Sequence, residues 1–86
     1  MAMGVLSAAA ESGRSVPQEI SIVGFDDIEL ASYTTPPLTT IAQPIPAIAL
    51  QAVACLVERI TANSHPPQRL VLPVKLAQRG STRRFP

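Results

Sequence analysis

The sequence predicts an α/β fold, because helical and strand-like segments alternate along the chain. Apolar residues recur at helical spacing over residues 2–12 and 46–61. Residues 20–25 and 38–42 instead form short apolar runs rich in β-branched side chains, which is typical of strands. Glycine and proline residues separate these segments. The expected order is helix, strand, short helix, strand, helix, strand.

Composition indicates an ordered chain of modest size. The 86 residues are 47% hydrophobic and 15% charged, which argues against intrinsic disorder. This length is enough for one small domain or for a piece of a larger one. The formal net charge of +1 is too balanced for a nucleic acid or an anionic membrane to be recognised by bulk electrostatics.

The first two elements are a helix and a buried strand. Residues 2–12 carry an apolar stripe, and Gly13 is a suitable helix terminator. The helical pattern starts without a capping residue in front of it, which suggests a chain cut from something longer. Residues 20–25 are almost continuously apolar, so we expect a strand buried on both faces of a parallel sheet.

The middle of the chain contains a short helix, a second strand and the clearest helix. Residues 28–33 are long enough for one or two helical turns, and the prolines at 36–37 prevent any continuation. Residues 38–42 are expected to form a strand. Residues 46–61 are expected to form an amphipathic helix with one apolar face.

The last quarter is less regular. Residues 63–67 form a turn cluster that includes His65, expected to be a solvated loop residue. Residues 70–72 and 74–77 are strand-like, and Pro73 between them implies an edge strand or a bulge. The polar end, 79–86, gathers Arg79 with two further arginines, and we expect a solvated, frayed tail.

The chain carries no feature that predicts a membrane location or an oxidising compartment. No unbroken apolar run reaches the roughly 18–20 residues that a bilayer span requires. The N-terminus has no basic region preceding an apolar one, as a secretion signal would. Cys55 is the one cysteine, so it has no partner within the chain for a disulfide, and we expect a buried, inert thiol. A cytoplasmic location without a membrane partner follows.

The candidate chemistry lies at Asp26 and Asp27, which follow the first strand directly. Ligands of open α/β sheets bind beyond the carboxyl ends of the strands. We expect Asp26 to face a ligand and Asp27 to cap the short helix, although both could simply be turn residues. A magnesium site would need a further carboxylate at a recognisable spacing, and the sequence offers none. We expect no metal, no cofactor and no enzymatic activity.

Several stretches resemble one family. The segment VPQEISIVGFDD at 16–27 resembles the "vP.dvsvvGfDd" stretch of LacI/GalR-type transcriptional regulators, and YTTPPLTTIAQP at 33–44 resembles their "y..PpLTTv.qp" stretch. Residues 69–73 and 79–82 resemble the family's C-terminal end, and 1–13 resembles the helix that precedes the first stretch. The resemblance implies a two-lobed, periplasmic-binding-protein-like domain that closes on a small metabolite. Residues 1–86 would be its C-terminal portion, without the DNA-binding domain.

The resemblance also implies roles for particular residues. Asp26 matches an aspartate that hydrogen-bonds effector hydroxyls or amines, Gln43 matches a position near the effector, and Ile45 matches a position that packs on the ligand. The segment that pairs lobes in a homodimer corresponds to Ile28, Leu30, Ala31, Tyr33 and Thr34. The implied partners are a sugar or related small molecule and a second copy of the chain, with DNA contacted only through a domain outside this chain. A sugar-binding protein of a transport system shares the fold and stays open as the alternative.

Overall fold

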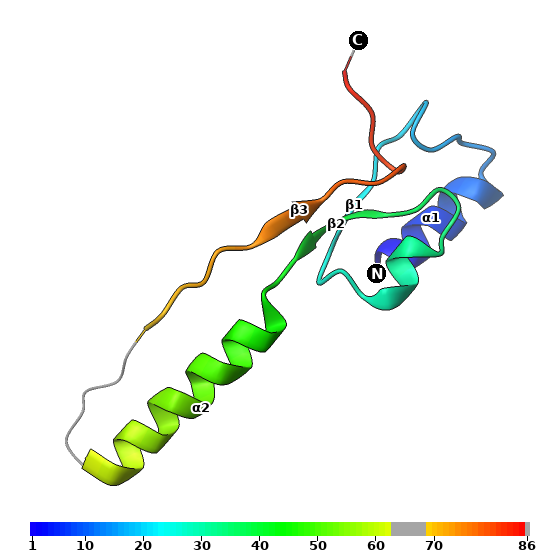
Figure 1. The fold of residues 1–86 in the computed structure, drawn as a ribbon. Helices are drawn as coiled ribbons and strands as arrows, with labels where there is room; N and C mark the ends of the chain where they lie inside the picture. The colour runs from blue at the N-terminus through cyan, green and yellow to red at the C-terminus, as the bar shows by residue number, and fades with distance from the viewer. Residues whose placement is uncertain (63–68, 86) are drawn as a thin grey trace. The chain divides into compact units, whose positions relative to one another are not determined.

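The computed structural model describes residues 1–62 and 69–85. Two compact units are formed, one by residues 1–43 with 75–86 and one by residues 44–74. The predicted α/β order of elements is confirmed (Figure 1). The elements are α1 (Ala2–Glu11), β1 (Val23–Phe25), the 3₁₀ helix η1 (Glu29–Ser32), β2 (Thr39–Ala42), α2 (Ile45–Ala62) and β3 (Lys75–Ala77). The predicted turn at 63–67, with His65, lies outside the described residues.

Within the described residues, the three strands form one sheet in the order β1-β2-β3. The parallel pair β1 and β2 places Val23 opposite Thr39, whereas the antiparallel pair β2 and β3 places Thr40 opposite Ala77. Because β1 and β2 are parallel, their carboxyl ends meet at the same edge of the sheet. This places the residues that follow the two strands next to one another.

The core of the first unit lies between α1, η1 and the sheet. Ile22, Ala31 and Leu38 are its buried apolar residues, and side chains of α1 pack against them. Gly24 allows this close approach, because an added Cβ would lie 2.8 Å from Leu38 Cδ2 and 3.3 Å from Ala2 Cβ.

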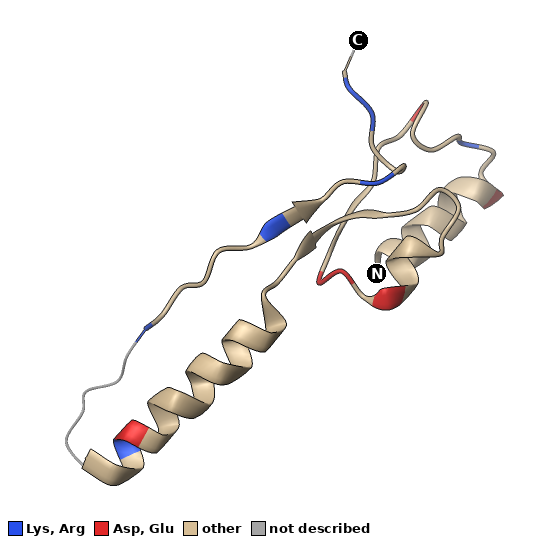
Figure 2. Cartoon of the chain, viewed as in Figure 1, with Lys and Arg blue, Asp and Glu red and all other residues tan. Residues whose placement is uncertain are grey.

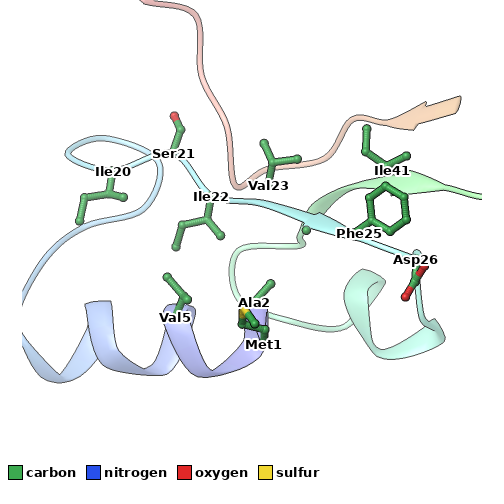
Figure 3. A pocket seen from close by; sticks show the side chains of 11 residues that line it. Met1, Ala2, Val5, Ile20, Ser21, Ile22, Val23, Phe25, Asp26 and Ile41 are labelled. Carbon is green, nitrogen blue, oxygen red and sulfur yellow. The ribbon is translucent and has the colours of Figure 1, made fainter. Parts of the chain in front are cut away.

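The prediction that the first strand is buried on both faces is wrong for this chain. Ile22, immediately before β1, is buried against α1, but Val23 and Phe25 are 55% and 61% exposed. Figure 3 shows Ile22 pointing toward α1 and Val23 pointing away from it. The reason is that, within the described residues, α1 packs on only one face of this strand.

The prediction of a frayed polar tail is also wrong for its first residues, because Ser81 is completely buried. Its Oγ donates a hydrogen bond to the Ile22 carbonyl (2.6 Å) and accepts one from the Thr39 amide (2.8 Å). The Ile22 amide in turn donates to the Ser81 carbonyl (2.9 Å), and the Gly80 amide donates to the Pro37 carbonyl (3.0 Å). The segment around Ser81 therefore joins the residues at the start of β1 to the start of β2.

In the second unit, α2 is regular but uncovered. None of its 18 residues is buried. The exposed large apolar side chains on it are Ile45, Ile48, Leu50, Val53, Leu56, Val57 and Ile60. Cys55 is half-buried, not fully buried as expected. The helix is charged only at Glu58 and Arg59, near its C-terminal end (Figure 2).

By length and composition alone, α2 is apolar enough to cross a membrane, with a mean hydropathy of 1.5 over 18 residues. The expectation based on apolar runs did not identify this helix. The expectation counted unbroken apolar runs, whereas an average tolerates the polar Gln51 and two charges near the helix end. Core helices of soluble proteins pass the same test, so it is weak support for a membrane location.

The predicted strand at 70–72 does not form, and β3 contains only Lys75–Ala77. Pro73 has no backbone N–H to donate to a neighbouring strand, so the ladder begins only after it. The apolar composition of residues 70–72 favours a strand, but only residues 75–77 pair with β2.

We predict that the isolated chain self-associates, because the apolar residues of α2 are exposed to water. Sedimentation velocity over a range of protein concentrations is expected to show oligomers that grow with concentration. The double substitution Leu50→Lys with Val57→Lys is expected to reduce the association, whereas Gln51→Lys, at a polar position of the same helix, leaves it unchanged. A monomer at every concentration that melts cooperatively would contradict the prediction.

We predict that Ser81→Ala lowers the free energy of unfolding by about 2–3 kcal/mol, because it leaves a buried N–H and a buried C=O without their partner. The control is Ser7→Ala, at an exposed position of α1, with an expected change within about 0.5 kcal/mol. Urea unfolding followed by circular dichroism, below the concentration of association, measures both. Equal stabilities of the two variants would show that the Ser81 hydroxyl is not needed.

Candidate functional site

The candidate site begins with the turn that follows β1. Asp26 and Asp27 both have positive φ, at 83° and 47°. Aspartate tolerates this left-handed backbone better than most residues because its side chain is short and polar. The Asp26 amide still donates to the Ile41 carbonyl of β2 (2.9 Å), so the turn remains attached to the sheet.

Asp26 and Gln43 are brought together at this edge. The Gln43 Nε2 donates a hydrogen bond to Asp26 Oδ1 (2.5 Å). Asp26 follows β1 directly and Gln43 follows β2 directly, so the parallel pairing of the two strands places them side by side. Asp26 is exposed and Gln43 is half-buried, so both remain accessible to a ligand.

The chemistry of this pair suits a ligand that donates hydrogen bonds. The carboxylate of Asp26 has further acceptor sites besides the one that Gln43 occupies. Because the Gln43 amide nitrogen faces Asp26, its Oε1 is the end left to accept a second hydrogen bond. Two neighbouring acceptors match two hydroxyl groups of one small molecule.

Asp27 does not have its predicted role as a helix cap. The residue at the N-cap of η1 is Ile28, and it makes no side-chain capping hydrogen bond. The Asp27 amide donates to Thr40 Oγ1 (3.2 Å), and its Oδ1 forms an ion pair with Arg79 Nη2 (2.9 Å). The carboxylate is therefore directed to Arg79 rather than to the amides of the helix.

Arg79 also belongs to the site, although its polar C-terminal segment predicts a solvated tail. Its Nη1 donates to the Leu38 carbonyl (2.8 Å), and its backbone amide donates to Thr39 Oγ1 (2.9 Å). The side chains of Arg79 and Asp27 are only 24% and 27% exposed. The sequence did contain one indication that this segment is ordered, because residues 79–82 resemble a segment of the LacI/GalR-type family and a frayed end would not be expected to match.

Ile45 belongs to a different unit from Asp26 and Gln43. It begins α2, in the second unit, where its side chain is exposed. Its role in packing on a ligand stays a prediction.

The predicted dimer segment divides into exposed and buried residues. Ile28, Leu30 and Tyr33 are exposed around η1. Ala31 is only 1% exposed and lies in the core, so its side chain offers no surface to a partner, and we remove it from the predicted interface. Thr34 is half-buried, and its hydroxyl already hydrogen-bonds the carbonyls of Ala31 and Pro36.

An open hollow of about 820 Å³ runs along β1, with Asp26 among its lining residues (Figure 3). Most of its lining is apolar and includes Val5, Ile22, Val23, Phe25 and Ile41. Such a surface is suited to packing against apolar groups rather than to a hydroxyl-rich ligand. Among the described residues, no group of three histidine, cysteine or acidic side chains could hold a metal ion.

The family model for the periplasmic binding protein-like domain matches residues 1–82. The chain belongs to this family. The HTH-type transcriptional regulator MalR of Streptomyces coelicolor is 43% identical over 86 residues, which is all of this chain and 25% of that protein. The ribose operon repressor of Escherichia coli K12 is 48% identical over 81 residues, 94% of this chain and 24% of the repressor. The chain thus spans about a quarter of the length of these curated relatives.

Solved structures agree with this assignment. A LacI family transcriptional regulator from Enterococcus faecalis V583 with bound ribose has a TM-score of 0.86 and 38% identity, covering 94% of this chain and 30% of the regulator. The lac repressor dimer bound to operator and the anti-inducer ONPF has a TM-score of 0.84 and 38% identity, covering 94% of this chain and 28% of the repressor. The resemblance to LacI/GalR-type regulators is confirmed, and a transport protein is not favoured.

Proposed function

We propose that this chain is the C-terminal part of the effector-binding domain of a LacI/GalR-type transcriptional regulator, and that the effector is a sugar or a related hydroxyl-rich metabolite. The observation that carries the proposal is the Asp26–Gln43 pair at the carboxyl ends of two parallel strands. The regulator with bound ribose, which matches 94% of this chain, supports a sugar as the ligand class.

In this proposal, Asp26 accepts a hydrogen bond from an effector hydroxyl, and the charge on the carboxylate strengthens it. The Gln43 Nε2 donates a hydrogen bond to Asp26 Oδ1, and the Gln43 Oε1 accepts a hydrogen bond from a second effector hydroxyl. Ile45 adds an apolar contact to the ligand. The chain binds the effector without transforming it, and acts in the cytoplasm.

Two further parts of the proposal concern partners. A second copy of the chain pairs through Ile28, Leu30 and Tyr33, which are exposed on one short segment, with Thr34 at its margin. The lac repressor, similar over 94% of this chain, is a dimer in its solved structure. DNA is contacted through residues outside this chain, because a net charge of +1 does not favour DNA binding by bulk electrostatics.

The binding proposal is tested in a chimaera in which this chain replaces the matching segment of the Enterococcus faecalis regulator. We predict that the chimaera binds ribose and that Asp26→Ala weakens binding about 10- to 100-fold, the effect of losing a charged hydrogen bond. Gln43→Ala is expected to have a smaller effect in the same direction. Isothermal titration calorimetry measures the affinities.

Glu11→Ala is the matched control, since it removes an exposed carboxylate at the end of α1. It is expected to leave ribose affinity unchanged. A folded chimaera that does not bind ribose, or one in which Asp26→Ala binds as tightly as Glu11→Ala, would contradict the proposal.

The dimer proposal is tested by placing this chain in the matching segment of the lac repressor. We predict that Leu30→Asp with Tyr33→Asp shifts the chimaera from dimer to monomer, because two buried charges would have no partner in the interface. Sedimentation velocity measures the mass, and Ser7→Asp on α1 is the charge-matched control. A dimer that persists in the double variant would rule out this segment as the interface.

A further inference from the structure

The backbone that carries Asp26 is in an unfavourable conformation. Asp26 and Asp27 are consecutive non-glycine residues with positive φ. Such residues are strained and persist only where surrounding contacts fix them. The orientation of the Asp26 carboxylate toward a ligand therefore depends on the contacts that hold this turn.

Among the described residues, three contacts hold this turn besides the hydrogen bond from Gln43 to the Asp26 carboxylate. The Asp26 amide is held by the Ile41 carbonyl, and the Asp27 amide is held by Thr40 Oγ1. Both of these partners belong to β2, and both hold only the backbone. The third contact is the ion pair of the Asp27 carboxylate with Arg79, which comes from the segment after β3.

Arg79 is itself firmly placed. One guanidinium nitrogen binds the Asp27 carboxylate while the other binds the Leu38 carbonyl, and the backbone amide binds Thr39 Oγ1. A planar guanidinium can serve a carboxylate and a carbonyl at once, whereas a lysine ammonium is a single point charge on a flexible stem. Because both side chains are about three-quarters covered, solvent screens the pair less than it screens an exposed pair.

We propose that Arg79 is a positioning residue for effector binding, which acts through Asp27 to hold the Asp26 carboxylate in its binding orientation. The inference rests on the proposed function, in which Asp26 receives the effector. Arg79 does not touch the effector in this proposal, since its two terminal nitrogens are engaged by Asp27 and Leu38.

If Arg79 had a purely structural role, its loss would lower the stability of the fold and the ribose affinity together. Ser81 already joins the backbone at Ile22 to the backbone at Thr39, independently of the ion pair. Loss of the pair should therefore change ribose affinity more than it changes folding.

The test uses the ribose-binding chimaera and the variants Asp27→Asn, Arg79→Lys and their combination. We expect each single variant to bind ribose about 5- to 20-fold more weakly than the parent chimaera. The double variant is expected to bind no more weakly than the single variant with the lower affinity, because the two substitutions remove the same interaction. The melting temperature of each is expected to stay within about 3 °C of the parent chimaera. Arg83→Lys, at an exposed arginine nearby in sequence, is the control and should change neither quantity.

Three results would overturn the inference. These are unchanged ribose affinity in both single variants, additive losses in the double variant, or an affinity loss that occurs only where the melting temperature falls as well. Additive losses would indicate that Arg79 and Asp27 act separately, for example by direct contact of one of them with ribose.

A second measurement does not depend on ribose binding, so it separates failure of this inference from failure of the proposed function. The side-chain amide of Gln43 reports on Asp26, because its nitrogen donates to the carboxylate. In nitrogen-15 NMR spectra of the chimaera, Arg79→Lys is expected to shift the Gln43 side-chain amide signals, and Arg83→Lys is not. Unshifted signals would overturn the positioning role, whereas a parent chimaera that fails to bind ribose would overturn the proposed function alone.

Discussion

The buried hydroxyl group of Ser81 connects the residue before β1 to the first residue of β2, at the amino-terminal end of this parallel pair of strands. It gives one hydrogen bond to the carbonyl before β1 and receives one from the first amide of β2. Serine suits this place because its hydroxyl both donates and accepts, and because it is small enough to be buried completely. Together with the direct pairing of β1 and β2, this connection holds the start of the parallel pair, and the candidate site lies at the opposite end of the same two strands.

The candidate site uses the same segment. Arg79 lies two residues before Ser81. Backbone hydrogen bonds join Ser81 to Ile22 and Gly80 to Pro37, and they fix the course of the backbone next to Arg79. From there the guanidinium reaches Asp27. A segment from the end of the chain thus supports a turn near its beginning, and the turn presents Asp26 to Gln43. The pairing of β1 with β2, the Asp27–Arg79 ion pair and the proposed ligand-binding pair of Asp26 and Gln43 are therefore linked through shared residues.

The apolar surface of the chain has a consistent physical meaning. The buried core of the first unit is small, whereas Val23 and Phe25 of β1 and most residues of α2 are exposed. Exposed apolar area of this extent is unfavourable in water and is normally covered by other protein. The curated relatives are about four times longer than the segment that they share with this chain.

The amino-acid sequence was enough to predict α1, β1, β2 and α2, because helical periodicity and short β-branched apolar runs are local properties of the chain, but it also predicted a strand at 70–72 that does not form. It also predicted that Asp26 and Gln43 lie near an effector, since both match positions of a recognised family. Only the tertiary structure decided that Ser81 is buried, that Ala31 belongs to the core and that Asp27 pairs with Arg79 instead of capping η1. Each of these depends on residues far apart in the chain, and local patterns carry no information about which distant groups will satisfy a buried hydroxyl or a charge.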